Sequence, residues 1–280
     1  MNPTPRTLPD ARGRRLPLRR YERVVSLVPS LTDTVFGLGA GSRLVGRTIY
    51  CVEPRREVRS IPACGGTKNP DLRKLQRVRP DLVLACLEEN KPEHLAAIEN
   101  AGVPVFAVMP RRLDDVAVML QEFGVILQAE AAGGRAMADL TAARLACGDF
   151  RRRTQGSGER LTVAVMIWKE PWMAAGGRTH IDAVLQELGF RNVFADRPDY
   201  PVTTVEELAG LQPDLVLLPD EPYRFTRHDA WALAAAGVIP DRRAALTLDG
   251  KLLSWYGTRT AKSLRRLVKM LERTVGPPSP

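Results

Sequence analysis

The chain has 280 residues, a length that favours two domains over one compact core. Hydrophobic residues make up 44% and charged residues 26% of it, which excludes a mainly disordered protein, and four cysteines are too few for a disulfide scaffold. A net charge of +9 could indicate a nucleic-acid partner. However, residues 1–23 and 259–273 each carry +5, and the remainder carries −1. Because the basic residues are terminal, we expect no nucleic-acid partner.

The N-terminal segment, residues 1–22, is rich in Arg and Pro. It contains no apolar run of the length that a signal peptide needs, and no stretch of 18 apolar residues occurs elsewhere in the sequence. These features predict a basic, disordered leader on a cytoplasmic chain. In that compartment the four cysteines are expected to be free thiols.

The first half of the chain alternates strands with helices. The pattern predicts a continuous apolar strand at 81–86, of the kind buried in parallel sheets. The other expected strands are 23–28, 44–50 and 103–108, and the helices are 31–38, 71–78, 91–101 and 113–128. Such alternation is typical of an α/β lobe with a parallel sheet, which we place at 23–128.

The second half repeats this order. PDLVL occurs at 80–84 and again at 213–217, and AGV occurs at 101–103 and again at 236–238. Similar segments in similar order indicate a second, similar lobe, which we place at 156–280. Its expected strands are 161–167, 214–218 and 245–248, and its helices are 179–188, 205–211, 231–236 and 263–274.

Residues 129–155 lie between the lobes, and 135–153 are rich in good helix formers. A helix of that length would span about 28 Å at about 1.5 Å per residue. The predicted fold class is therefore α/β, with two Rossmann-like parallel-sheet lobes joined by one long rigid helix. Ligands of open α/β sheets bind at the carboxyl ends of the strands, so we expect a cleft there between the lobes.

The loops expected at this cleft contain three of the four tryptophans and three of the five tyrosines. They predict an aromatic-lined pocket, although the same rings could instead pack beneath the loops as a satellite core. The aromatic candidates for ligand binding are Tyr50, Trp168, Trp172, Tyr223, Trp255 and Tyr256. The other candidates are Ser30, Cys51, Gly66, Thr67, Glu88, Glu89, Arg178 and Arg259.

Several weaker signals have two interpretations. Ser30 could bind an anion at a helix start or simply cap the helix, and residues 176–179 could cradle a polar group or form a tight turn. His180 is more simply a helix-start residue than a ligand. Cys51 and Glu88 belong to no metal-binding spacing, so we expect no metal site. No P-loop, nucleophile elbow or GxGxxG occurs.

The sequence resembles the class III substrate-binding proteins of ABC importers, which have a helical backbone, and especially their cobalamin-binding branch. The resemblance covers about residues 22–274. It rests on RVVSLVPSLTDTVFGLG at 23–39, PDLVLACLEEN at 80–90, PWMAAGGRTHIDAVLQELG at 171–189, PDLVLLPDEPY at 213–223 and SWYGTRT at 254–260. It implies two Rossmann-like lobes, one rigid helix between them, and a bound cobalamin, ferric siderophore, haem or metal ion.

The resemblance also implies roles for single residues. Tyr50 matches an aromatic residue that contacts the corrin, and Trp168 and Trp255 fall in the equivalent loops of the second lobe. Gly66-Thr67 and Cys86 stand where the cobalamin-binding members have tryptophans. The pocket of this chain is therefore expected to be lined differently.

Docking to an importer is a second departure from the family. The resemblance implies one glutamate per lobe, which pairs with arginines of the membrane subunits. Alignment on the PDL segments makes Glu206 the second-lobe glutamate, but its first-lobe counterpart is Arg73. A guanidinium there would repel the same partner, so docking to ABC importer subunits is doubtful. We expect a monomer.

The sequence leads to three hypotheses about function. The first is a binding protein, with no built-in cofactor, that holds a corrinoid (vitamin B12-like) ligand in the aromatic cleft. The second is a binding protein for a ferric siderophore, haem or another iron chelate, in which Arg178 and Arg259 would meet anionic groups. The third is a chelatase-like tetrapyrrole enzyme, for which Glu88, Glu89 and His180 are the candidate acid–base groups.

Overall fold

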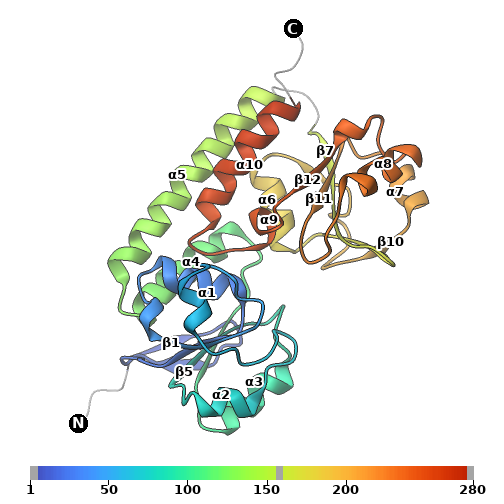
Figure 1. Cartoon of the computed structure of the whole chain (residues 1–280). Coiled ribbons are helices and arrows are strands. Elements are labelled where there is room, and N and C mark those ends of the chain that lie inside the picture. The colour runs from blue at the N-terminus through green and yellow to red at the C-terminus, as the bar shows by residue number, and fades with distance from the viewer. Residues whose placement is uncertain (1–5, 156–159, 276–280) are drawn as a thin grey trace. The chain divides into compact units, whose positions relative to one another are not determined.

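The computed structural model describes residues 6–155 and 160–275 and divides into two compact units (Figure 1). The first unit comprises Met1–Pro110, Asp114–Asp139 and Tyr256–Arg259, and the second comprises Arg111–Leu113, Leu140–Trp255 and Thr260–Pro280. The segment Tyr256–Arg259 was expected in the C-terminal lobe, but its contacts place it in the first unit.

A four-stranded parallel sheet forms the centre of the first unit. Its strands are β4 (Leu44–Arg47), β3 (Val24–Ser26), β5 (Leu82–Cys86) and β6 (Val105–Val108), in that order. The helices are α1 (Pro29–Gly37), α2 (Leu72–Arg77), α3 (Pro92–Asn100) and α4 (Leu113–Ile126), with 3-10 turns at Gly41–Arg43 and Glu57–Ser60. Every residue of β5 is buried, as expected for a strand covered on both faces.

The N-terminal leader forms a β-hairpin, so the expectation of disorder across residues 1–22 is wrong for the part described. Strands β1 (Thr7–Pro9) and β2 (Arg15–Pro17) pair antiparallel. The buried Asp10 carboxylate accepts hydrogen bonds from the backbone N–H groups of Arg12 at 2.8 Å, Arg14 at 3.0 Å and Ala107 at 3.3 Å. A short acidic side chain can organise a turn in this way. Residues 1–5 lie outside the described part.

The second unit contains a six-stranded sheet. Strands β7 (Thr162–Trp168), β11 (Leu215–Pro219) and β12 (Ala245–Leu248) are parallel, and β9 (Arg191–Asn192) pairs parallel to β7. The parallel sheet was predicted. In addition, β8 (Trp172–Ala174) and β10 (Val202–Thr203) pair antiparallel. The helices are α6 (His180–Glu187), α7 (Val205–Leu211), α8 (Arg227–Ala235), α9 (Lys251–Ser254) and α10 (Thr260–Val275), with a 3-10 turn at Arg242–Ala244.

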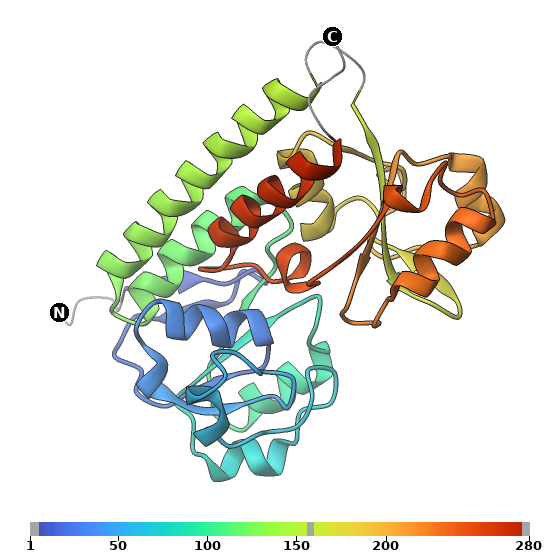
Figure 2. The same cartoon turned by 45° about the horizontal axis from the view of Figure 1, so that its top comes forward.

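The long helix α5 (Glu130–Gln155) extends five residues before the predicted 135–153. From Leu140 onward it belongs to the second unit, where Phe150 packs edge-on against Phe190. The Arg144 guanidinium donates to the Glu187 carboxylate at 3.2 Å. Figure 2 shows α5 as one uninterrupted helix.

The internal repeat is visible in the local geometry of two short helices. Asp71 caps α2 by accepting a hydrogen bond from the Lys74 N–H at 3.0 Å. Thr204 caps α7 in the same way, from the Glu207 N–H at 3.1 Å. Arg73 and Glu206 are each the second residue after the cap, and both are exposed. Each of these helices precedes a buried PDLVL strand, so the two positions are structurally equivalent.

Candidate functional site: aromatic surfaces at the carboxyl ends of the strands

An aromatic cluster lies where β7, β8 and β11 of the second unit meet their loops. The Trp168 ring packs edge-on against Tyr223, with ring centroids 5.5 Å apart. Trp172 stacks on Phe225 at 5.8 Å, and Tyr223 contacts Phe225 at 4.7 Å. Trp168 keeps 42% of its surface exposed, whereas Phe225 is buried. The cluster therefore presents Trp168 to solvent, and the neighbouring rings hold it in place.

A salt bridge between Lys169 and Asp229 stabilises this cluster. The Lys169 ammonium donates to the Asp229 carboxylate at 2.7 Å and lies 5.6 Å from the centre of the Trp172 ring. The same Asp229 accepts from the N–H and hydroxyl of Thr226, closing the capping box at the start of α8. The pKa of Asp229 is lowered: burial raises it, but the hydrogen bonds from Lys169 and Thr226 outweigh that effect.

Tyr50 is the exposed aromatic residue at the corresponding end of the first unit. It follows β4 and is 57% exposed, beside Ile49 at 55% and Val52 at 49%. A side chain at Gly66 would lie 3.3 Å from the Tyr50 ring, so a small residue there leaves room for the phenol. Together Ile49, Tyr50 and Val52 form an exposed apolar surface, of which sequence analysis identified only Tyr50. The predicted cleft between the lobes stays a prediction.

Asn90 joins the loops that flank this surface. Its side chain accepts from the Cys86 N–H at 2.9 Å and donates to the carbonyls of Thr67 at 2.9 Å and Leu27 at 3.3 Å. The Lys68 ammonium donates to the Glu88 carbonyl at 2.6 Å. The predicted residues Gly66, Thr67, Glu88 and Glu89 are all partly buried. Asn90 lies in a loop expected at the cleft, but its side-chain hydrogen bonds were not predicted, because a buried amide leaves no signal in a single sequence.

Three predicted ligand contacts, Ser30, Cys51 and Tyr256, are buried within the first unit. Tyr256 is only 3% exposed, and burial raises its pKa well above the usual value, with Cys86 and Glu89 adding to the effect. Burial also raises the pKa of the Cys86 thiol to about 12. Cys51 accepts a hydrogen bond from the Thr32 hydroxyl at 3.1 Å. We assign these side chains to packing.

The segment Tyr256–Arg259 lies unusually close to α1. A Cβ at Gly257 would lie 1.9 Å from the Thr34 hydroxyl oxygen, and a Cβ at Gly37 would lie 2.3 Å from that of Thr258. Two glycines therefore permit this approach. The Arg259 guanidinium is engaged by Asp33, so the predicted anion contact at Arg259 would have to compete with a carboxylate.

The remaining predicted residues of the second unit differ in exposure. Trp255 is buried, with the Lys251 ammonium 5.8 Å from its ring centre. Gly176 and Gly177 donate their backbone N–H groups to carbonyls of the same unit at 2.7–3.1 Å, which favours the tight-turn interpretation over a cradle for a polar group. Arg178 is exposed. Burial lowers the pKa of His180 to about 4, and its ring does not line the surface.

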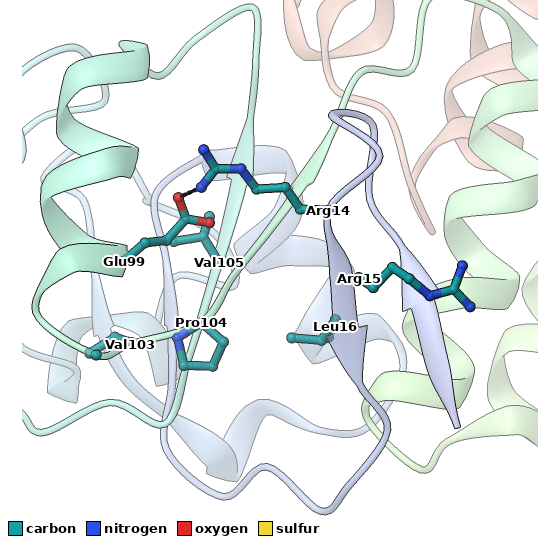
Figure 3. Close-up of a pocket in the computed structure, with 8 residues that line it drawn as sticks. Arg14, Arg15, Leu16, Glu99, Val103, Pro104 and Val105 are labelled. Carbon is teal, nitrogen blue, oxygen red and sulfur yellow. Dashed lines mark hydrogen bonds and ion pairs between the residues drawn. The ribbon is translucent and has the colours of Figure 1, made fainter. Parts of the chain in front are cut away.

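A separate cavity of about 390 Å³ lies beside the N-terminal hairpin (Figure 3). Leu16 points toward Pro104 across it, and the Arg14 guanidinium pairs with Glu99 at its rim. It adjoins the start of β6, not the carboxyl ends of the strands. It therefore lies apart from the Tyr50 surface.

The described residues contain neither a metal-binding cluster nor a membrane-spanning helix. Within 6–155 and 160–275, no group of three His, Cys, Asp or Glu side chains could hold a metal ion. Within these residues, no helix is long and apolar enough to cross a bilayer. The four cysteines are free and buried, which confirms the predicted free thiols.

Comparison with known proteins identifies the family. The model of the periplasmic binding protein family matches residues 24–217. This chain belongs to the periplasmic binding protein family. Its fold is that of solved members: it superposes on a periplasmic haem-binding protein of Pseudomonas aeruginosa with a TM-score of 0.79, at 26% identity, covering 92% of this chain and 95% of that one. The resemblance stated from sequence is thereby confirmed.

Two further relatives carry the name of another ligand. A vitamin B12-binding protein of Yersinia pestis (strain Pestoides F) is 24% identical over 95% of this chain and 90% of its own length. The vitamin B12-binding protein BtuF of Vibrio cholerae shares the fold at 20% identity, with a TM-score of 0.76 over 91% of this chain and 98% of that one. The cytoplasmic location expected from the sequence has no support in these matches, because the family is named for periplasmic proteins.

Proposed function

We propose that this periplasmic binding protein family member binds a corrinoid ligand through aromatic side chains at the carboxyl ends of its strands. The observation that supports the proposal best is Trp168, which is 42% exposed and packs edge-on against Tyr223. Flat macrocycles offer broad apolar faces that pack against aromatic rings. The relatives named for vitamin B12 binding agree with this ligand class.

Titration of the purified, ligand-free chain tests the proposal. Cobalamin and cobinamide should each give saturable heat in calorimetry and a shift in the visible spectrum. Cobinamide lacks the nucleotide loop, so equal binding of both compounds would assign the contact to the corrin ring. No binding of either compound at high micromolar concentration would rule out the corrinoid.

Haem is the second candidate, and one observation favours it. Haem iron takes protein axial ligands, tyrosine among them, and the Tyr50 phenol is exposed. Cysteine thiolates are less available for this purpose, because all four thiols are buried. The haem-binding protein of Pseudomonas aeruginosa is a relative of similar fold. Ferric siderophores belong to the same alternative and would use Arg178.

Two substitutions of Tyr50 separate the candidates. Tyr50→Phe keeps the ring and removes the oxygen, so corrinoid affinity should change less than about twofold, whereas a haem–tyrosinate absorption band should disappear. Tyr50→Ala removes the ring as well and should weaken corrinoid binding by roughly tenfold, about 1.4 kcal/mol. A chain that uses Tyr50 as an iron ligand would instead lose haem binding equally in both variants.

The family consists of ligand-binding proteins, and we propose that this chain has no catalytic role. The chelatase alternative required an acid–base group at the surface, but His180 is buried, which leaves only Glu88 and Glu89. Metal insertion into a porphyrin, assayed with Glu89→Gln beside the unaltered chain, tests that alternative. Turnover that this substitution abolishes would establish the enzyme.

Importer docking and location complete the proposal. We propose that Glu206 alone offers the acidic contact to importer subunits, because Arg73 occupies the equivalent position in the first unit. Arg73→Glu should then strengthen binding to an importer that accepts two glutamates. Fractionation of cells producing the chain decides between the cytoplasmic location expected from sequence and the periplasmic one that the family name implies.

A further inference from the structure

A second cavity, of about 510 Å³, lies in the second unit at the edge strand β12. Three consecutive strand residues line it: Ala245, Leu246 and Thr247. Alternate side chains of a strand point to opposite faces of the sheet, so three neighbours can line one cavity only if it runs along the strand's edge. The cavity therefore gives access to the backbone of β12.

Helices on both sides of the sheet complete the lining of this cavity, which we call the edge groove. Trp231 comes from α8 and Met270 from α10, and Figures 1 and 2 draw these two helices on opposite sides of the sheet. β12 pairs with β11 on one side, and no strand of the described residues pairs with its other side. Its outward N–H and C=O groups thus face the groove unpaired by a strand.

The groove is strongly basic. Arg227, Arg242 and Arg243 line it, and the first two make no ion pair with any described residue. Among the described residues, Arg243 pairs only with the exposed Asp241, at 3.3 Å, and its side chain is 88% exposed. The Trp231 ring, 49% exposed, supplies an apolar surface among the three guanidinium groups.

We propose that this groove binds an extended acidic peptide segment of a partner protein, which adds to β12 as a further strand. Main-chain hydrogen bonds to the edge would hold the peptide. Its carboxylates would meet the arginines, and its apolar side chains would contact Trp231 and Met270. The groove runs along β12 and shares no lining residue with the aromatic rings Trp168, Trp172 and Tyr223, so the inference does not rest on the proposed ligand.

The test uses the full chain and a fluorescein-labelled nonapeptide of alternating Glu and Val, blocked at both ends. Fluorescence anisotropy should show saturable binding at low salt that weakens as salt rises. A peptide of alternating Lys and Val should not bind. N-methylation of alternate residues, which removes the hydrogen bonds of one peptide edge, should abolish binding. Unchanged binding of the methylated peptide would overturn strand addition.

Variants locate the site on the chain. Arg242→Glu with Arg243→Glu should weaken peptide binding by roughly tenfold or more, and Trp231→Ala by about threefold to tenfold. The matched control is Arg55→Glu with Arg56→Glu, an exposed adjacent pair in the first unit, which should bind as the unaltered chain does. Unfolding midpoints show that each variant is folded.

Two further outcomes contradict the proposal. Equal loss of binding in the Arg55 and Arg56 control would mean that general charge, and not the groove, attracts the peptide. Tighter binding of a nine-residue oligothymidylate than of the acidic peptide would assign the arginines to a polyanion site. Corrinoid titration of the same variants should be unchanged, so failure of the peptide proposal and failure of the corrinoid proposal can be told apart.

Discussion

Arg259 and Asp33 form a two-point ion pair although they are 226 positions apart in the sequence. The Nη2 atom of Arg259 lies 2.8 Å from Oδ1 of Asp33, and Nε lies 3.0 Å from Oδ2. This geometry joins the segment Tyr256–Arg259 to helix α1 within the first unit. It is the bidentate arrangement that makes arginine–carboxylate pairs stronger than simple charge contacts.

Removing this pair should destabilise the chain. Arg259→Ala should lower the free energy of unfolding by about 1–2 kcal/mol, more than an exposed pair, because both side chains are mostly buried. Urea unfolding followed by circular dichroism measures the change. The control is Arg266→Ala, whose guanidinium is more exposed and lies 3.9 Å from Asp249; a loss below about 0.5 kcal/mol is expected there. Equal losses in both variants would contradict a special role for Arg259.

Gly257 should tolerate no side chain. Its φ of +108° disfavours L residues, and a Cβ would overlap the Thr34 hydroxyl. Gly257→Ala should therefore cost about 3 kcal/mol of unfolding free energy. Adding Thr34→Ala removes the overlapping oxygen and should restore part of the loss. Gly210→Ala in α7 meets no atom within 4 Å and should be neutral or stabilising. A neutral Gly257→Ala would show that the segment can move away from α1.

The sequence predicted the elements well where local pattern decides them. PDLVL at 80–84 and 213–217 marked the buried strands β5 and β11, and helix-forming composition marked α5. The equivalence of Arg73 and Glu206 also followed from alignment of the repeat, because each lies at the same distance before its strand.

The remaining features depend on contacts between distant residues, which no local pattern reports. Tyr256 was predicted to contact the ligand but lies buried beside Cys86, because two glycines let its segment approach α1. The hairpin at β1 and β2 depends on Asp10 meeting the backbone of Ala107. Trp168 and Tyr50 are exposed, and their predicted role in ligand binding stays a prediction; the support of Trp168 by Tyr223 required the fold.

Glu122 should make stability depend on pH. Burial, and secondarily the negative Asp10, raises its pKa from 4.5 to about 7. A carboxyl whose pKa is higher in the folded state favours folding at low pH, and this stabilisation is lost as pH rises from about 4.5 through 7. Glu122→Gln keeps the group neutral and should stabilise the chain by about 1–2 kcal/mol at pH 8.5, a value discounted for partial exposure.

Unfolding of both proteins at several pH values measures this effect. At pH 4.5 or below the side chain of Glu122 is neutral in the folded chain, so the difference between the proteins should shrink toward zero. A difference that stays constant from pH 4.5 to 8.5 would contradict ionisation as its cause.

Trp168 should contribute to ligand affinity without contributing to stability. Trp168 is 42% exposed and so available to a macrocycle, and its ring packs edge-on against Tyr223 within the second unit. Trp168→Ala should weaken corrinoid binding by roughly tenfold, about 1.4 kcal/mol, and change the unfolding free energy by less than about 1 kcal/mol. Trp231→Ala is the matched control, because Trp231 is 49% exposed but lies on α8 beside β12. Calorimetric titration of both variants should show the loss in Trp168→Ala alone; equal affinities would remove Trp168 from the site.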